Sequence, residues 1–288
     1  MKQKRRKHRG ATLLRRFLLL LLIAAIYLCW ENTSLQVASF SRSFADLPHG
    51  FDGCRIAVVS DLHGAKFGKE NEDLFAAIAA ENPEYIFYLG DLEDRFRGSQ
   101  SGYAETVAAG LSAIAPTYYV TGNHEWAIGD VPRLKKALEE NGVTVLSNRY
   151  VTLERNGDTV ILAGIDDPNG YADQKTPEEL ASELYAQHGD PFWMLLAHRN
   201  NLFRSRYSLL GADLVLSGHG HGGIWRLPFT DGLVGNDANL FPSYMAGFYE
   251  ENGSLLFTTR GLGNSGSSFR FLNRPEVASL TLHTKQGS

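Results

Sequence analysis

The sequence predicts an α/β domain made of two packed β-sheets. Up to residue 141, apolar segments of strand length alternate with helical segments, which is typical of βαβ units with right-handed crossovers. After residue 141 the strand-like segments follow one another closely, as expected for a second sheet. The chain has 288 residues and is 43% apolar, which is enough to fill one large core.

The first half is expected to form the βαβ array. Strands are predicted where apolar residues run together, and helices where they recur every three or four positions. Pro132 can open the last of these helices, because proline is tolerated in a first helical turn. In chain order the predicted elements are a strand at 55–60, a helix at 69–82, a strand at 85–89, a helix at 103–114, a strand at 117–121 and a helix from 132 onward.

The second half is expected to have shorter connections. The pair Asn156-Gly157 is a strong signal for a hairpin turn between two strands. The segment Thr176-Pro177-Glu178-Glu179 is a helix start signal. The predicted elements are strands at 143–146, 150–155 and 159–165, a helix at 176–187, and strands at 192–197, 214–217, 255–259 and 278–282.

The charge of the chain is concentrated at its N-terminus. Residues 1–16 form a basic head with eight of the 28 basic side chains and no acidic one. The rest of the chain carries 20 basic and 32 acidic side chains, a balance of −12. Binding to a nucleic-acid duplex is not expected of such a body, because phosphate-backbone binding relies on clustered Lys and Arg.

The apolar run at 17–30 has two interpretations. A membrane-spanning helix needs about 20 residues, which flanking Leu13, Leu14 and Trp30 help to supply. A cleaved signal peptide needs only about 7–15 apolar residues, but a small-residue cleavage site must follow, and residues 36–39 match one poorly. We therefore favour an uncleaved signal anchor, followed by a polar tether over 31–53 and the folded domain over 54–288.

The positive-inside rule sets the expected topology. The basic head should remain in the cytoplasm, so the protein should be a single-pass protein of the cell membrane with an extracytoplasmic domain. Cys29 lies in the apolar run and Cys54 at the start of the domain, and the chain has no other cysteine. A disulfide or a cysteine-type zinc site is therefore not expected.

Five groups of polar residues each follow a strand-like segment. Taken alone, each group is an ordinary turn or helix cap. Together they indicate one site, because the carboxyl ends of neighbouring parallel strands meet at one sheet edge. The groups are Asp61-Leu62-His63, Gly90-Asp91-Leu92-Glu93-Asp94, Gly122-Asn123-His124-Glu125, Ala197-His198 and Gly218-His219-Gly220-His221.

The residue types in these groups favour a metal site. Oxygen and nitrogen ligands without thiolates suit divalent Mn, Fe, Zn or Co, and seven are too many for one tetrahedral centre. Two ions about 3.5–4 Å apart can activate water and stabilise an in-line displacement at phosphorus. His124 is left over and can protonate a leaving oxygen, oriented by Glu125 or Asp94. The candidate ligands are Asp61, His63, Asp91, Asn123, His198, His219 and His221.

The order of these motifs resembles that of the calcineurin-like metallophosphoesterases. The second motif reads Gly90-Asp91-Leu92-Glu93-Asp94-Arg95, and the resemblance covers about residues 55–283. The segments 217–229, 260–266 and 273–277 are similar to those of bacterial membrane-anchored or exported phosphodiesterases. The resemblance implies a four-layered α/β/β/α sandwich of two mixed sheets, with a dinuclear site on loops at the strands' C-terminal ends.

The resemblance also implies a role for each site residue. Asp91 would bridge two metal ions, and His124 would be the acid or the stabiliser of the transition state, supported by Asp94, Arg95 and Glu125. The first ion would be held by Asp61, His63 and His221, and the second by Asn123, His198 and His219. The chain departs from its relatives at Arg199-Asn200, where a proline is common, and at Ile224, where glutamine is common.

The function implied is metal-dependent hydrolysis of a phosphodiester, with a lipid-linked or cell-wall-linked substrate near the membrane. A phosphomonoesterase and a lipid pyrophosphohydrolase remain alternatives, because the same metal clamp serves all three reactions. A non-catalytic scaffold of the same fold would be expected to have lost ligands. The aromatic-rich segment 225–249 is either a cover over the sheet edge or a substrate lip for an apolar moiety.

Overall fold

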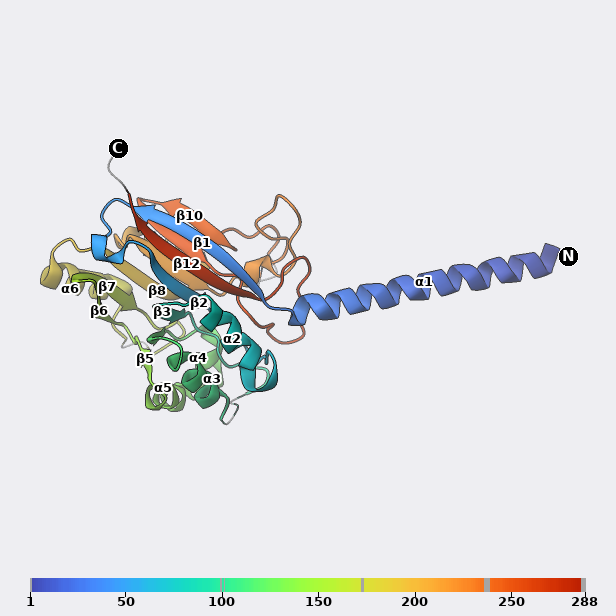
Figure 1. Cartoon of the computed structure of the whole chain (residues 1–288), viewed down its shortest axis with the longest axis horizontal. Helices are drawn as coiled ribbons and strands as arrows, with labels where there is room; N and C mark the ends of the chain where they lie inside the picture. Colours follow the sequence, from blue (N-terminus) through green and yellow to red (C-terminus); the bar gives the residue numbers. More distant parts are fainter. Residues whose placement is uncertain (1, 99, 101, 172–173, 236–238, 286–288) are drawn as a thin grey trace.

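The computed structural model describes residues 2–98, 100, 102–171, 174–235 and 239–285. Its body contains two six-stranded sheets (Figure 1). The strand order of the first sheet is β1-β12-β2-β3-β4-β5, and that of the second is β10-β11-β9-β8-β7-β6. Both sheets are mixed, since each combines parallel neighbours with at least one antiparallel pair.

The first sheet has a parallel half that carries part of the site. Strands β2 to β5 are parallel neighbours, whereas β12 runs antiparallel to β2 and parallel to β1. The strands are β1 (Gln36–Phe44), β2 (Cys54–Val59), β3 (Tyr85–Tyr88), β4 (Thr117–Tyr119), β5 (Val143–Val145) and β12 (Glu276–Thr284).

The second sheet has a parallel centre with an antiparallel strand at each edge. Strands β7, β8, β9 and β11 are parallel, and β6 and β10 are the antiparallel edges. The strands are β6 (Arg149–Arg155), β7 (Asp158–Gly164), β8 (Trp193–Arg199), β9 (Leu214–Gly218), β10 (Gly247–Glu251) and β11 (Ser254–Thr258).

Helices α2, α3 and α5 pack on the outer face of the first sheet and α6 packs on that of the second, whereas α1 projects from the body (Figure 1). The α-helices are α1 (Lys2–Thr33), α2 (Glu72–Ala80), α3 (Tyr103–Ser112), α4 (Asn123–Ile128), α5 (Val131–Glu140) and α6 (Pro177–His188). The 3-10 helices are η1 (His49–Phe51), η2 (Lys69–Asn71), η3 (Asn200–Leu202), η4 (Tyr207–Leu209) and η5 (His221–Gly223).

Alternation of side chains along the strands builds four layers. In β2, Ile56 and Val58 point into the core between the two sheets, while Ala57 and Val59 join the core beneath α2, α3 and α5. A third apolar core lies between the second sheet and α6. The predicted α/β/β/α sandwich of two mixed sheets is therefore confirmed.

Helix α1 projects away from the body as one long rod (Figure 1). Its segment Thr12–Thr33 has 22 residues and a mean hydropathy of 2.1, so it is long and apolar enough to cross a membrane. At 1.5 Å per residue this segment spans about 33 Å, close to the roughly 30 Å of a bilayer's hydrocarbon core. Cys29 and Cys54 are both free, as predicted.

The prediction of a polar tether over 31–53 is wrong. Helix α1 continues to Thr33, and Gln36–Phe44 forms strand β1 at the edge of the first sheet. Phe40 and Phe44 of β1 pack on the core between the sheets, where their rings meet Phe257 and Phe192 at centroid distances of 4.9 and 5.2 Å. The body therefore begins directly at the end of α1.

The end of α1 is docked on the loop before β12. The Glu31 carboxylate, 2% exposed, accepts the Asn273 N–H at 2.8 Å. The Asn32 side chain accepts the Arg270 N–H at 2.7 Å and donates to the Arg270 carbonyl at 3.0 Å. The Arg274 guanidinium lies 4.8 Å from the centroid of the Trp30 ring. These contacts fix the helix end against the body.

Candidate active site

The strands deliver the predicted ligands to one edge of the two sheets. Asp61 and His63 follow β2, and Asp91 follows β3. Asn123 begins α4 directly after β4. His198 lies near the end of β8, and His219 and His221 follow β9. All seven predicted ligands come together there, although the chain separates the first and last by 160 positions.

The first group of donors is Asp61, His63 and His221, all buried. The Nε2 atoms of the two histidines are 3.1 Å apart, and their rings stack at a centroid distance of 4.9 Å. The Asp61 Oδ1 atom lies 3.9 Å from His63 Nε2 and 3.5 Å from His221 Nε2. Three donor atoms from two strand ends thus face one point.

The second group converges on His198 Nε2. This atom lies 3.2 Å from His219 Nδ1, 3.2 Å from Asn123 Oδ1 and 3.3 Å from Asp91 Oδ2. The same Asp91 Oδ2 atom is 3.7 Å from His63 Nε2, which belongs to the first group. Asp91 therefore stands between the two groups.

The electrostatics of the site favour a bound cation. Burial lowers the pKa values of His63, His219 and His221, so these rings are neutral and can offer a lone pair. His198 donates from Nδ1 to the Leu89 carbonyl at 2.7 Å, which directs Nε2 toward Asp91. Burial opposes protonation of His198, but the Asp91 carboxylate outweighs it and raises the His198 pKa to about 10. A divalent cation bound between Asp91 and His198 would supply the positive charge that a proton on His198 otherwise supplies.

Backbone strain is concentrated in the predicted ligands. Five of the seven adopt a positive φ, a region that costs non-glycine residues of order 1–3 kcal/mol each. Such strain persists only where the surrounding fold imposes it, and it aims several side chains at one point. These residues are Asp61 (52°), His63 (50°), Asp91 (54°), His219 (65°) and His221 (46°). The donor set, its burial and its aim fit divalent metal binding.

His124 is held by a carboxylate beside these groups. Its Nδ1 lies 3.0 Å from Asp94 Oδ1, and Asp94 is itself fully buried and accepts the Gly266 N–H at 3.1 Å. A ring nitrogen of His124 lies within 4.8 Å of the ligand atoms of His63 and Asp91. The Nδ1 atom of His124 is hydrogen-bonded to Asp94. The Nε2 atom faces the Ser265 hydroxyl at 3.4 Å and is the atom available to a substrate.

Glu125 supports the loop of Asp91 rather than His124. Its carboxylate accepts N–H bonds from Asp91 (3.0 Å), Leu92 (2.7 Å), Glu93 (3.2 Å) and Gly122 (2.7 Å). Burial and the neighbouring Asp91 raise the pKa of Glu125 to about 8, against these amides, which favour its charged form. Of the two carboxylates considered for orienting His124, only Asp94 contacts its ring.

Two residues of the site were not singled out from the sequence. Arg270 is fully buried, and its Nη2 lies 3.3 Å from His221 Nδ1. Burial lowers its pKa to about 10, and it also donates to the carbonyls of Arg260 and Gly263, both at 2.8 Å. Ser265 is the second such residue. Arg270 is not marked by a local sequence pattern, and Ser265 lies in the segment 260–266 that carries part of the family resemblance; both reach the site through a loop without regular structure.

A pocket of about 400 Å³ opens over the donor groups. The pocket is lined by His124 and by four of the predicted ligands, Asp91, Asn123, His219 and His221. Arg95 lines the same pocket, and its guanidinium lies 4.7 Å from the centroid of the Phe96 ring. The pocket thus places metal-binding side chains, an oriented histidine and a positive charge around one space, an arrangement suited to hydrolysis of a phosphoester.

The fold and the site define a metal-dependent phosphoester hydrolase. The family model of calcineurin-like phosphoesterases matches residues 54–223, and the chain belongs to this family. It is 27% identical over 271 residues to the uncharacterized metallophosphoesterase YkoQ of Bacillus subtilis (strain 168), covering 92% of this chain and 97% of that protein. The metallophosphoesterase YkuE of the same organism is 30% identical over 245 residues, covering 82% and 81%.

A vertebrate relative is named as a transmembrane protein. The transmembrane protein with metallophosphoesterase domain of Danio rerio is 29% identical over 250 residues, which cover 82% of this chain and 54% of that protein. Together with the apolar segment of α1, this similarity points to a membrane protein.

Proposed function

We propose that the protein is a membrane-anchored phosphodiesterase that uses two divalent metal ions. Asp61, His63 and His221 would hold one ion, and Asn123, His198 and His219 the other, with Asp91 shared. Two ions bound there would polarise the phosphoryl oxygens and lower the pKa of a water molecule. The observation that carries the proposal is the position of Asp91 Oδ2, 3.3 Å from a histidine of one group and 3.7 Å from a histidine of the other.

The residues of the chain would supply the rest of the chemistry. Asp94 holds the His124 ring, so that a proton on Nε2 can pass to the leaving oxygen. Arg95, at the mouth of the pocket, would attract the phosphate and stabilise the charge that develops on it. The hydroxyl of Ser265 lies on the same side and would help to fix the proton on His124 Nε2.

A phosphomonoesterase and a lipid pyrophosphohydrolase use the same kind of clamp and remain the alternatives. The diester is favoured here because two arginines, Arg95 and Arg199, are among the described residues that line the pocket, and one of them is already paired with a carboxylate. Arg199, which also lines the pocket, is neutralised by Asp167 at 2.7 Å.

We expect the protein to hydrolyse bis(p-nitrophenyl) phosphate faster than p-nitrophenyl phosphate. Release of p-nitrophenolate measures both rates with the full-length protein in detergent. A chelator should abolish the diesterase activity, and added Mn²⁺, Zn²⁺ or Co²⁺ should restore it. A faster monoester reaction would favour the phosphomonoesterase, and activity that survives complete metal removal would contradict the metal mechanism.

We expect residues 1–16 to lie in the cytoplasm and the body to lie outside. Eight basic side chains precede the apolar segment, whereas residues 31–41 contain none, and the positive-inside rule orients such a segment. Protease added to intact spheroplasts should digest the body. Digestion only after lysis would place the active site on the cytoplasmic side. Loss of residues 1–30 from the mature protein, detected by N-terminal sequencing, would identify a cleaved signal peptide instead of an anchor.

A further inference from the structure

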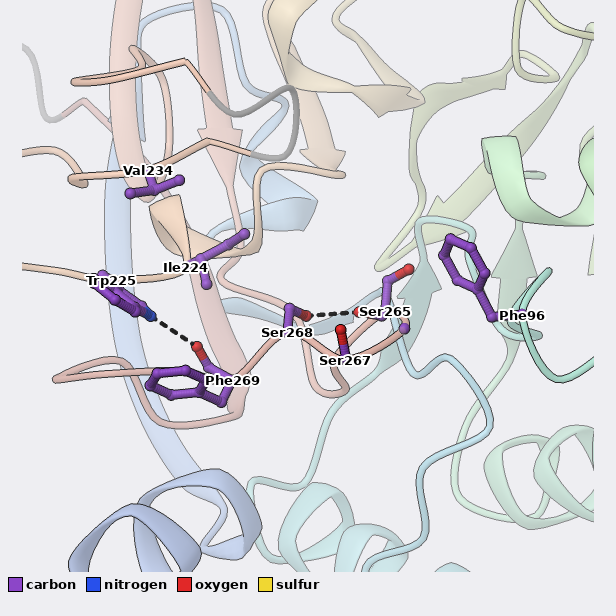
Figure 2. Close-up of a pocket in the computed structure, with 9 residues that line it drawn as sticks. Phe96, Ile224, Trp225, Val234, Ser265, Ser267, Ser268 and Phe269 are labelled. Carbon is purple, nitrogen blue, oxygen red and sulfur yellow. Dashed lines mark hydrogen bonds between the residues drawn. The ribbon is translucent and has the colours of Figure 1, made fainter. Parts of the chain in front are cut away.

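The mouth of the active site continues into a second, apolar groove. This groove of about 660 Å³ shares Phe96, Ile224, Ser265 and Ser268 with the pocket over the donor groups. Figure 2 shows it extending from Phe96, past Ser265 and Ser268, to Trp225 and Phe269 at the opposite end. A substrate whose phosphate lies at the donor groups could therefore place an apolar moiety along the groove.

Around the groove, bulky apolar side chains face solvent. We call this surface the apolar rim and define it by its exposed side chains. Segment 225–249 is therefore not a simple cover over the sheet edge, because several of its largest apolar side chains point outward. The rim consists of Phe96 (64% exposed), Trp225 (37%), Leu227 (40%), Phe229 (108%), Leu240 (67%), Phe241 (64%), Phe269 (44%) and Leu272 (44%).

The backbone of the rim is ordered by its own hydrogen bonds. Leu233 N–H donates to the Trp225 carbonyl at 2.7 Å, and Arg226 N–H donates to the Phe271 carbonyl at 2.9 Å. Ile224, Phe229, Phe241 and Leu272 nevertheless adopt positive φ values of 41°, 69°, 52° and 52°. Bulky residues rarely occupy this region, and strain of this kind gathers at functional sites. The exposed side chains are thus held outward by a built structure.

The rim lies beside the end of α1. Asn32 is bonded to Arg270, whose chain neighbour Phe269 belongs to the rim, and Trp30 lies against Arg274, two positions from Leu272. Figure 1 shows the orange and red-brown loops of the rim on the side of the body from which α1 leaves. Since no tether separates α1 from the body, a bilayer crossed by Thr12–Thr33 must lie next to this side.

We propose that the apolar rim dips into the bilayer surface and that the substrate is a phosphoester whose apolar part remains in that bilayer. Aromatic and aliphatic side chains at such a position bind the interface between head groups and acyl chains. The substrate class rests on the phosphodiesterase activity proposed above, whereas the contact with the bilayer rests only on the membrane anchoring by α1.

Contact with the bilayer can be tested without any activity measurement. The full chain carrying Phe229→Trp would be reconstituted in phosphatidylcholine vesicles with or without brominated acyl chains. We expect brominated lipid to quench the added tryptophan. The matched control is Leu209→Trp, because Leu209 is 66% exposed but lies in η4, outside the rim. Equal, weak quenching of both variants would overturn the proposal. Quenching that changes with the number of protein molecules per vesicle would also overturn the proposal, because it would indicate that a second copy of the protein covers the rim.

The substrate class needs a second measurement. The double variant Phe229→Asn/Phe241→Asn suits the backbone, because asparagine tolerates positive φ. Rates would be compared on a dioleoyl phosphodiester with a p-nitrophenyl head group, in vesicles, and on bis(p-nitrophenyl) phosphate in solution. We expect the ratio of the first rate to the second to fall about tenfold or more, as for loss of a buried phenyl group.

The control Leu209→Asn should leave this ratio unchanged. Equal losses on both substrates in the double variant, or no preference of the wild-type protein for the lipid diester, would overturn the substrate class. If the wild-type protein hydrolyses neither diester, the proposed phosphodiesterase function fails. The quenching experiment then still decides separately whether the rim enters the bilayer.

Discussion

Replacement of His124 by alanine is expected to lower turnover by about 10²–10⁴-fold while the protein keeps its metal ions. The His124 ring is fixed through Nδ1 by Asp94, and its Nε2 lies 3.4 Å from the Ser265 hydroxyl. The loss should be smaller for diesters with very acidic leaving groups, because these need little protonation. Turnover and elemental analysis on the same sample would measure both effects.

The variant Asp94→Asn provides the matched control for His124. It keeps the side-chain shape and the bond from Gly266, but it removes the charge that orients and polarises the ring. We expect it to lose activity to a smaller extent than His124→Ala, with the same trend across leaving groups. Loss of a metal ion from His124→Ala would show that His124 is a ligand. An equal loss for good and poor leaving groups would assign it to charge stabilisation.

Replacement of Asp91 by asparagine should weaken both metal ions together. Asp91 Oδ2 lies between His198 and His63, so the substitution removes the one negative charge common to both groups. The Oδ1 atom would still accept the His124 N–H, as it does at 2.9 Å, so the loop should keep its shape. Elemental analysis after dialysis should find less than one ion per chain, and activity should fall with the metal content.

Asp61→Asn is the matched control for Asp91. The Asp61 carboxylate belongs only to the first donor group, although it also accepts the backbone N–H of His219 at 3.0 Å, so this variant should lose one ion and keep the other. Circular dichroism and thermal unfolding of both variants would separate metal loss from misfolding. Two ions still fully bound in Asp91→Asn would exclude the bridging assignment. A loss of both ions in Asp61→Asn as well would mean that the two centres bind cooperatively.

The sequence was informative wherever the structural signal is local. Strands β2, β3, β4, β8 and β9 are short apolar runs that end in a polar motif, and each was predicted within a few residues. The convergence of the ligands followed from one general property of parallel sheets, that carboxyl ends share an edge. The convergence of the ligands could therefore be anticipated from the residues, whereas the family and the four-layered fold were implied by the resemblance of the motifs.

Features that depend on distant partners were missed. All positions of strand β1 are at least partly exposed to solvent. The strand forms because its backbone pairs with β12, which lies over 230 positions later in the chain. The length and composition of 31–53 thus resemble those of a tether. Arg270 likewise has no local motif, because its role beside His221 arises from the packing of a loop. The amino-acid composition of segment 225–249 could not predict that the rim is exposed, because a segment buried over the sheet edge would also be rich in aromatic residues.

The place of β12 in the first sheet constrains the order in which the protein can fold. This strand, residues 276–284, inserts between β1 and β2, which are synthesised before the rest of the two sheets. While the ribosome produces the intervening 200 or so residues, both edges stay unpaired, and long-range closure of this type is slow. The membrane segment in α1 is synthesised before β12, so the incomplete domain would lie beside the bilayer with the backbone groups of β1 and β2 unpaired on the side that β12 later fills. Such an intermediate is a natural client for chaperones, because unpaired edges are prone to aggregation.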